Sequence, residues 1–218
     1  SVTFSINMAS EEKAEPGRLR YQVIREADER IIDQVVLLHH EALSYRSFIT
    51  TFGLPFLAAL YREILKQGIG FLVVVHEQFH VHGFTLGTID SSRLLTIMIK
   101  RFYVFLPLML KRLFSDWRAL HKLFQTFFYL EKEDTNIQAE LVVIVVDAEL
   151  RSKGIGRTLL RMLDDEFLHQ GIHKYKVTVH EEMKASNHFY TKNGMQIQRT
   201  FRMYGHTWNL FVREIDKK

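Results

Sequence analysis

The sequence contains no cysteine among its 218 residues. Without cysteine the chain can form no disulfide, zinc–thiolate site or cysteine nucleophile. A cysteine-free composition is compatible with a reducing compartment, so we expect a cytoplasmic protein. The first residues are polar and acidic and do not resemble a signal peptide, and the sequence contains no internal repeat.

Two common nucleotide-binding motifs are also absent. A Walker loop requires Gly-x-x-x-x-Gly-Lys-Ser/Thr, which the sequence does not contain. A dinucleotide fingerprint requires Gly-x-Gly-x-x-Gly, and the third glycine would fall at position 159, which is leucine. A phosphate ligand would therefore need another kind of loop.

The composition is that of an ordinary globular protein. Hydrophobic residues make up 47% of the chain and charged residues 25%. A chain of 218 residues suits one domain, or one domain with an insertion. The net charge of +4 suits an anionic cofactor or an anionic surface, and we expect no nucleic-acid partner.

The most informative stretch runs from residue 140 to residue 171. Residues 141–146 form an apolar run rich in valine and isoleucine, which predicts a strand buried on both faces. Residues 151–157 read Arg-Ser-Lys-Gly-Ile-Gly-Arg. Apolar residues then recur at helical spacing until Gly171, where a helix should end. The predicted unit is strand, glycine loop, helix.

This unit favours a bound phosphate. A helix that begins after a glycine loop presents unpaired backbone N–H groups and the positive end of its dipole. Gly154 and Gly156 lack a Cβ and allow close backbone approach. Arg151, Lys153 and Arg157 add positive charge.

The pattern Arg151-x-x-Gly154-x-Gly156 resembles the acyl-CoA loop of the GCN5-related N-acetyltransferases, Gln/Arg-x-x-Gly-x-Gly/Ala. The match extends backward through residues 144–147 and forward into the helix. The alternative is a glycine-rich corner between strand and helix that binds no ligand. The resemblance implies an N-acetyltransferase with acetyl-CoA as co-substrate and no metal.

The order of predicted elements resembles the same family. Strands are expected over residues 21–24, 71–75, 80–89, 141–146, 174–180, 196–203 and 207–214, and helices from 27, over 53–67, from 155 and over 185–193. Gly83 and Gly87 inside the third strand indicate a bulge or a close approach. The resemblance implies an α/β acyltransferase fold, with a central, mostly antiparallel sheet flanked by helices. We expect a flexible lead at residues 1–19 and one domain at 20–218.

A basic and apolar segment interrupts this order, and we expect it to be a helical insertion at residues 91–136. Residues 91–129 should form two or three short helices, broken at Pro107. Lysines and arginines interrupt each apolar run before the roughly 20 residues that a membrane span needs.

In this family two central strands splay apart and the cofactor lies between them. The resemblance places the strand backbone at 144–146 along the pantetheine and the glycine loop against the pyrophosphate. Asn187 could replace the amide that the family often carries where this chain has Met183. The implied cofactor-binding residues are Ile144, Val145, Val146, Arg151, Ser152, Lys153, Gly154, Ile155, Gly156, Arg157 and Asn187.

The resemblance also names a catalytic acid. Residues 189–195 resemble the family segment Phe-Tyr-x-x-x-Gly-Phe, whose tyrosine often protonates the CoA sulfur, and this implies Tyr190. A phenol with a pKa near 10 suits a thiolate whose conjugate acid has a pKa near 8.5. The alternative is an aromatic packing residue.

For the base, Glu140 is the candidate, since relatives often use a glutamate at the start of this strand. In a regular strand it would point with Val142 and Ile144. The alternative is a surface glutamate at a strand edge. His180 and Glu181 are weaker candidates, and the position where some relatives carry a base glutamate is Thr178.

The acceptor should be a primary amine of a small molecule, with an amino sugar as one candidate. By fold analogy it would lie near His39, His40, Tyr45, Arg46 and Phe48. A second hypothesis is a non-catalytic module that docks on a membrane or an acidic partner through residues 91–129, because basic amphipathic helices bind anionic lipid. An exposed apolar and basic segment also favours a homodimer.

Three histidines in one predicted hairpin, His76, His80 and His82, carry a faint metal signal. The sequence shows no supporting carboxylate and no ligand spacing typical of a metal site. We therefore expect ordinary strand histidines.

Overall fold

The structure, a computed structural model, describes residues 18–43, 49–78, 80–115, 136–203 and 205–216. The strands form one seven-stranded sheet in the order β1-β2-β3-β4-β5-β7-β6. Neighbouring strands are antiparallel except for β4 and β5, which are parallel. The strands are β1 (Arg20–Ile24), β2 (Gly70–Glu77), β3 (His80–Thr88), β4 (Glu140–Val146), β5 (Lys174–His180), β6 (Gln196–Met203) and β7 (His206–Glu214).

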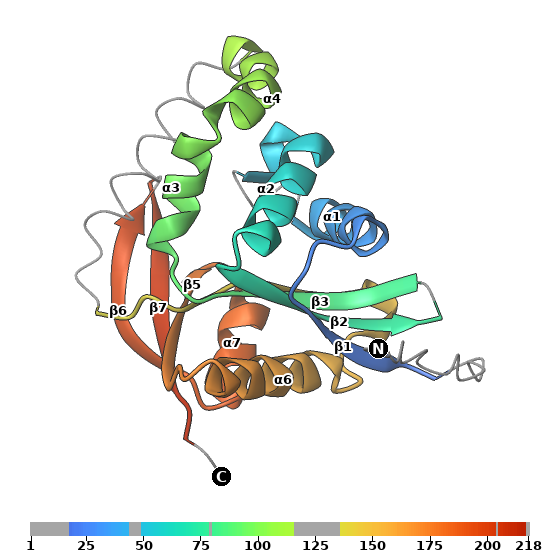
Figure 1. Cartoon of the computed structure of the whole chain (residues 1–218). Helices are drawn as coiled ribbons and strands as arrows, with labels where there is room; N and C mark the ends of the chain where they lie inside the picture. Colours follow the sequence, from blue (N-terminus) through green and yellow to red (C-terminus); the bar gives the residue numbers. More distant parts are fainter. Residues whose placement is uncertain (1–17, 44–48, 79, 116–135, 204, 217–218) are drawn as a thin grey trace, which may run out of the picture.

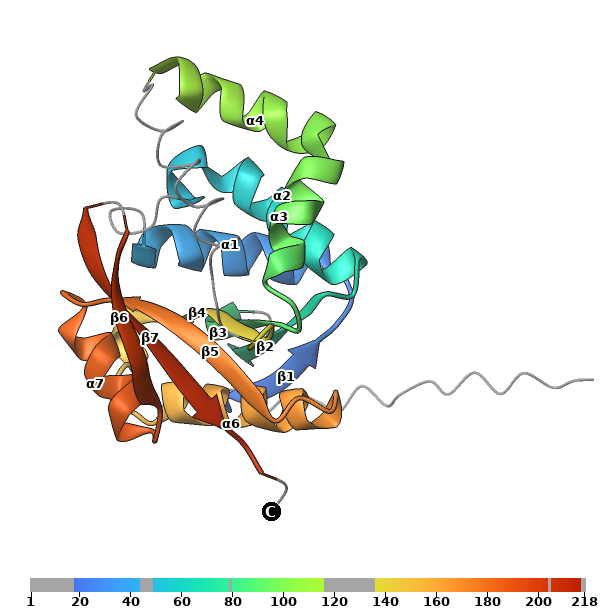
Figure 2. The same ribbon diagram turned by 90° about the vertical axis from the view of Figure 1, so that its left-hand side faces the viewer.

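Helices cover both faces of the sheet (Figures 1 and 2). One face carries α1 (Glu29–Leu43) and α2 (Leu54–Lys66), with α3 (Ser92–Lys100) and α4 (Phe102–Ser115) beside them. The other face carries α6 (Ile155–His169) and α7 (Lys184–Lys192). This order confirms the predicted fold class, and residues 1–17 of the expected lead lie outside the described residues.

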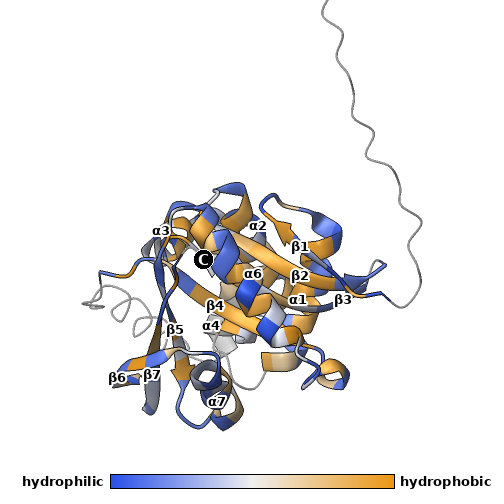
Figure 3. Ribbon diagram, turned by 90° about the horizontal axis from the view of Figure 1, so that it is seen from below, coloured by the Kyte–Doolittle hydropathy of each residue, from blue (hydrophilic) through white to orange (hydrophobic). Residues whose placement is uncertain are grey.

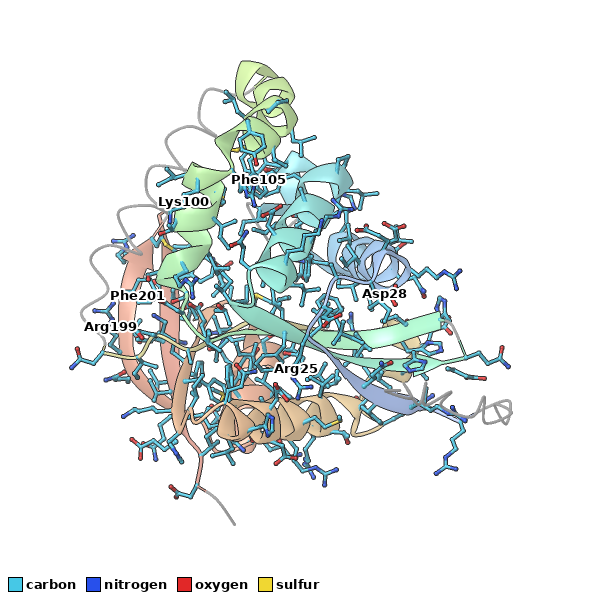
Figure 4. The ribbon with its side chains drawn as sticks, in the orientation of Figure 1. Arg25, Asp28, Lys100, Phe105, Arg199 and Phe201 are labelled. Carbon is cyan, nitrogen blue, oxygen red and sulfur yellow. The ribbon has the colours of Figure 1, made fainter. Side chains whose placement is uncertain are left out.

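The two layers of helices enclose two hydrophobic cores. The α1–α2 core includes Ile32, Phe56, Leu57, Tyr61, Phe84 and Val143. The α6 core includes Phe71, Leu159, Leu163, Phe167, Tyr175 and Phe211. Figure 3 shows the apolar strands β2 and β4 from the α6 side, and Figure 4 labels Phe105 of α4, whose ring lies 5.4 Å from that of Phe56.

Local sequence signals start the first two helices where they were predicted. The Asp28 carboxylate accepts hydrogen bonds from the backbone N–H groups of Arg30 (2.9 Å) and Ile31 (3.3 Å), which caps α1. Gly53 precedes α2 with a φ of 88°, and Pro55 lies in the first turn.

The sequence predicted that Pro107 would break the helical segment, and this prediction is wrong, because Pro107 lies inside α4. The break falls at Arg101, between α3 and α4, where φ is −105° and ψ is 27°. Pro107 is exposed, and a helix can continue through an internal proline with a kink. Residues 116–129 of the predicted helices lie outside the described residues.

Both faces of β4 pack in a core, as predicted, but the burial is incomplete. Leu141, Val143 and Val145 are buried, but the side chains between them are only partly buried. The reason is that β4 has a neighbouring strand along only part of one edge. A strand buried throughout its first six residues does occur, but it is β2.

The glycines of β3 behave as predicted. A Cβ at Gly87 would lie 2.8 Å from Leu163 of α6 and 2.8 Å from Phe71, and the ladder with β4 shifts register between Leu86 and Gly87. A Cβ at Gly83 would lie 3.0 Å from the carbonyl oxygen of Val145. These glycines let α6 and β4 approach β3 closely.

Candidate functional site

The central feature of the site is a gap between β4 and β5, which we call the β4–β5 gap. The two strands pair only at Glu140 and Lys176, and the N–H of Lys176 donates to the carbonyl of Ala139 at 3.0 Å. From there β5 stays paired with β7 as far as His180 and Trp208. The carboxyl-terminal part of β4 therefore has an edge that β5 does not cover, as the predicted splay requires.

The glycine loop, residues 151–156, lies at the end of β4 and leads into α6. Ser152 and Gly154 both have positive φ angles, 64° and 84°. Gly154 is the N-cap of α6 and has no side chain to cap the helix. Backbone N–H groups in such a loop converge, and the helix dipole adds positive potential. A loop of this geometry can bind an anion.

The two glycines of the loop serve different purposes. A Cβ at Gly154 would meet no atom within 4 Å, so that position is open and its glycine is required by the positive φ. A Cβ at Gly156 would lie 3.3 Å from the ring of Phe189 on α7. Gly156 therefore lets α7 pack against α6 and joins the two motifs that the sequence singled out.

The charged side chains of this region face solvent. Arg151, Lys153 and Arg157 are exposed, and so is Ser152, whereas Ile155 is buried. Because its side chain is buried, Ile155 can contact a ligand only through its backbone. The guanidinium Nε of Arg151 donates to the carbonyl of Val146 at 3.0 Å, which holds Arg151 beside the end of β4.

Tyr190 lies on α7 and is 4% exposed. Its ring packs against Phe189 of the same helix and Phe211 of β7, with centroids 5.3 and 5.7 Å apart. Burial raises the pKa of the Tyr190 phenol well above its ordinary value of 10. The side chain therefore stays neutral and keeps its O–H as a donor at physiological pH.

Glu140 points in a different direction from the one predicted. The ladder pairs Gly87 with Leu141 but Leu86 with Val143, so the strand bulges at the residue between them. Leu141 packs in the α6 core and Val143 in the α1–α2 core. Glu140 therefore lies on the α1–α2 face, opposite Ile144, because β4 is not a regular strand.

Sequence reasoning missed Lys176, the ladder partner of Glu140. It is 3% exposed, and its neighbours Tyr175 and Val177 pack in the α6 core. Alternation places Lys176 on the same face as Glu140, so an acid and a base share the closed end of the gap. The alternation of residues 174–177 could have indicated this position.

Asn187 braces the site from within the protein. Its side-chain nitrogen donates to the carbonyls of His180 and Met183, each at 2.9 Å. Its oxygen accepts from Asn209 of β7 at 2.8 Å. The amide ties the start of α7 to β5 and β7, and its contact with the cofactor stays a prediction.

The weaker base candidates lie at the open end of the gap. The backbone N–H of Glu182 donates to Nδ1 of His180 at 3.2 Å, and the His180 ring lies 5.0 Å from that of Trp208. Glu181 is exposed, and Thr178 is half-buried on β5, the strand that also carries His180. No catalytic role for these residues follows from the geometry.

His39 is a core residue and cannot face the acceptor as predicted. Its Nδ1 lies 2.8 Å from the hydroxyl of Tyr61, and the side chain is buried. Burial lowers the pKa of His39 from 6.5 to about 4, so the imidazole is neutral at pH 7. His40 is half-buried, and Tyr45, Arg46 and Phe48 lie outside the described residues.

The hairpin histidines are arranged differently from the predicted cluster. His80 and His82 lie together with the carboxylate of Asp147, their ligand atoms all within 4.8 Å of one another. His76 is not in this group, and its Nδ1 lies 3.0 Å from the carbonyl of Gln78. The expectation that no carboxylate supports these histidines is therefore wrong.

A separate depression of about 550 Å³ lies at the other end of the two central strands. Ile137, His173 and Lys174 are among its lining residues. At that end β4 and β5 are held together, so this depression is distinct from the β4–β5 gap.

A comparison with known families matches the part of the chain that carries the glycine loop. The Acetyltransferase (GNAT) family matches residues 117–195, a span that includes β4, the glycine loop, α6 and Tyr190. The match covers about a third of the chain, and the fold of the described residues is that of GNAT proteins. The match supports the predicted enzyme class, because the matching model is that of an acetyltransferase family. No curated protein matches the chain.

Solved structures share the GNAT fold over most of their length. A Salmonella typhimurium protein described as an acetyltransferase, with its cofactor acetyl-CoA, is 16% identical, with a TM-score of 0.59 over 93% of this chain and 96% of that chain. The PaiA N-acetyltransferase of Thermoplasma acidophilum, in complex with coenzyme A, is 12% identical, with a TM-score of 0.57 over 90% and 99%. Ard1 of Thermoplasma volcanium is 14% identical, with a TM-score of 0.56 over 90% and 99%. At these identities the likeness shows the fold.

Among the described residues, none of the helices combines the length and the hydropathy that a membrane crossing requires.

Proposed function

We propose that this chain transfers an acetyl group from acetyl-CoA to a primary amine of a small molecule. The observation that carries the proposal is the β4–β5 gap, with the glycine loop at one side of its mouth. Helix α7, which carries Tyr190, packs against Gly156 of this loop through Phe189. Structural neighbours solved with acetyl-CoA and with coenzyme A support acetyl-CoA as the co-substrate.

The cofactor would be held mainly by backbone groups. The N–H groups of the glycine loop and of the first turn of α6 would bind the pyrophosphate, and Arg151, Lys153 and Arg157 would add charge from solvent-exposed positions. The edge of β4 at residues 144–146, which β5 does not cover, would hydrogen-bond the pantetheine as an added strand does, and the carbonyl of Val146 would exchange its bond to Arg151 if the pantetheine needs it. Side-chain identity on β4 then matters little for binding.

The reaction joins the amine nitrogen to the thioester carbonyl carbon. The C–N bond forms, the C–S bond breaks, and the electron pair of the C–S bond leaves with the sulfur. The ammonium must first lose a proton, and Glu140 is the proposed acceptor of that proton, directly or through water. The nitrogen loses a second proton to solvent after the C–N bond has formed.

Tyr190 would act on the leaving thiolate. Because burial raises the pKa of its phenol, full proton transfer to a thiolate is less favourable than it would be from an exposed tyrosine. We infer that Tyr190 mainly donates a hydrogen bond to the sulfur as negative charge develops there. The thiolate can then collect its proton from solvent.

The test compares acetyl-CoA binding by the wild type with binding by Gly154→Glu in calorimetric titrations. The new carboxylate would stand beside the pyrophosphate, and we expect at least a tenfold loss of affinity. Gly171→Glu is the matched control, since Gly171 also has a positive φ, 75°, and open space around its Cα, but lies at the far end of α6. A wild type that does not bind acetyl-CoA, or equal losses in both variants, would contradict the proposed cofactor site.

The acceptor is proposed as a small primary amine, with amino sugars as the first compounds to screen. Glu140 and Lys176 face the α1–α2 side of the sheet, so an acceptor that reaches the thioester from that side meets one acidic and one basic residue. Acetylation assays with amino sugars, amino acids and a lysine peptide would separate the acceptor classes. Turnover with the peptide alone would contradict the small-molecule proposal.

A second candidate function rests on α3 and α4. Ile99, Tyr103 and Leu106 are exposed apolar side chains, and Arg93 and Lys100 are exposed nearby (Figure 4 labels Lys100). A surface that is both apolar and basic suits an anionic membrane. We propose this docking role as an alternative to catalysis by a soluble enzyme.

Co-sedimentation with phosphatidylserine vesicles tests the docking role. The double variant Ile99→Ser, Leu106→Ser should lose vesicle binding, whereas Leu37→Ser, an exposed leucine on α1, should retain it. Wild type that stays in the supernatant would exclude the membrane contact. A concentration-dependent dimer in analytical ultracentrifugation, removed by the same double variant, would assign the surface to a second copy of the chain.

A further inference from the structure

We propose that His80, His82 and Asp147 form a binding site for a divalent transition metal ion such as Zn²⁺. The ligand atoms of the three side chains lie within 4.8 Å of one another. Two imidazoles and a carboxylate are ligands that zinc accepts, and solvent can complete the coordination because His80 is exposed. This site lies on β3 and at the end of β4, outside the β4–β5 gap.

The fold brings these residues together from two strands. His80 and His82 lie two residues apart on β3, and their ring centroids are 4.6 Å apart. The ladder with β2 pairs Val75 with Gly83 but His76 with Val81, so His82 is the extra residue of a bulge. The backbone N–H of Asp147 donates to the carbonyl of His82 at 2.8 Å, which places the carboxylate beside the rings.

The donor atoms are available to a metal ion. Within the described part of the chain, Nδ1 of His82 is buried without a hydrogen-bond partner, which is costly for a polar atom. Asp147 Oδ2 lies 3.8 Å from that nitrogen, close to the roughly 3.4 Å that separates two ligands of a tetrahedral zinc ion with bonds of about 2.1 Å. A small closure of the site would complete both bonds.

The carboxylate is already oriented for this role. Asp147 Oδ1 accepts a hydrogen bond from the N–H of Glu149 at 3.2 Å and leaves Oδ2 toward the histidines. Such a second contact fixes the direction of a metal ligand. A bound ion would link β3 to the residue that precedes the turn into the glycine loop.

The other group of potential ligands in the described residues, His180, Glu182 and His206, is less suited. Nδ1 of His180 already accepts the N–H of Glu182, and the Glu182 side chain is 82% exposed. This group also lies at the open end of the β4–β5 gap and belongs to the site already described.

The test is a calorimetric titration of metal-free protein, dialysed against EDTA, with ZnCl₂ in the absence of acetyl-CoA. We expect one equivalent to bind at micromolar levels, and His80→Ala and Asp147→Asn to weaken binding at least tenfold. His76→Ala, in the same hairpin but outside the group, should bind as the wild type does. Because no cofactor is present, a failure here leaves the proposed acetyl transfer unaffected.

Two results would overturn the metal site: unchanged affinity in Asp147→Asn, or loss of binding in His206→Ala with full binding in His80→Ala. Both His80 and Asp147 are at the surface, so these variants should fold, and thermal unfolding without metal checks this. Replacement by Co²⁺ adds a spectroscopic readout. The visible absorption of a tetrahedral Co²⁺ site should appear in the wild type and in His76→Ala and be absent in Asp147→Asn.

Discussion

At the scale of single residues, burial decides what two conspicuous side chains can do. Tyr190 and His39 were both candidates for contact with substrates, and both are buried. Burial keeps each of them in its neutral form, which suits Tyr190 as a hydrogen-bond donor and makes His39 part of the core. The two residues therefore predict different experimental signatures.

Tyr190→Phe keeps the ring in its packing position and removes the O–H. We expect turnover to fall about 100-fold, the range for loss of one oriented donor, with the affinity for acetyl-CoA changed less than twofold. Tyr103→Phe, on the exposed surface of α4, is the control and should be fully active. Steady-state kinetics measure both effects, and an undiminished turnover in Tyr190→Phe would remove this residue from the mechanism.

His39 predicts a pH dependence of stability. Between pH 6.5 and pH 4 the unfolded chain binds a proton at His39 that the folded chain does not, because burial lowers the folded pKa to about 4. The contribution of His39 to the free energy of unfolding is complete above pH 6.5. It decreases as the pH falls and is smaller by about 2 kcal/mol at pH 5. Urea unfolding at pH 7 and pH 5 measures it.

The free energy of unfolding of His39→Leu should fall by about 2 kcal/mol less than that of the wild type between pH 7 and pH 5. His188→Leu, at an exposed histidine of α7, should keep the wild-type dependence. Parallel curves for the wild type and His39→Leu would show that the imidazole does not titrate as described.

At the scale of elements, one buried carboxylate joins α6 to β5 and β7. Asp164 accepts the phenol of Tyr175 at 2.7 Å and the guanidinium of Arg213 at 2.6 to 3.0 Å. Arg213 also donates to the carbonyl of Asn193, just after α7. The helices behind the β4–β5 gap are therefore held to the sheet through this group. A second ion pair, Arg25 with Glu166, ties the end of β1 to α6 (Figure 4 labels Arg25).

Asp164→Asn should destabilise the protein by about 3 kcal/mol, because it leaves the guanidinium of Arg213 partly buried without its counter-charge. Asp165→Asn, the next residue on the exposed side of α6, should change stability by less than 0.5 kcal/mol. Denaturant unfolding of the two variants makes the comparison. Similar values for both would contradict the bridging role of Asp164.

At the scale of the whole molecule, the sheet is continuous at one end and divided at the other. β1 to β4 form one half and β5, β7 and β6 the other, and the halves are joined only where Glu140 meets Lys176. A ligand that enters the gap contacts both halves and should stabilise the complete fold.

Acetyl-CoA at 100 times its dissociation constant should raise the free energy of unfolding by about 2.7 kcal/mol, because it binds only the folded state. Gly154→Glu should lose this gain and Gly171→Glu should keep it. Thermal unfolding with and without acetyl-CoA measures the difference. Stabilisation of both glycine variants to the wild-type extent would argue for a binding site away from the glycine loop.

Local pattern alone determined much of this protein. The alternation and spacing of apolar residues placed the strands and helices, Gly171 and Gly194 marked helix ends with positive φ, and the run from Arg151 to Gly156 indicated the acyl-CoA loop. These features depend on neighbours within a few residues, so the sequence is sufficient to predict them.

Only the tertiary structure decided the features that depend on pairing between distant strands. The bulge between Leu141 and Val143 turned Glu140 to the α1–α2 face, the divergence of β4 from β5 left Ile144 half-buried, and the β2–β3 bulge brought His82 toward Asp147. A one-residue shift in a ladder reverses every later side chain and leaves no local trace in the sequence. For that reason the sequence revealed the cofactor loop, whereas the direction of the base and the histidine–aspartate group required the fold.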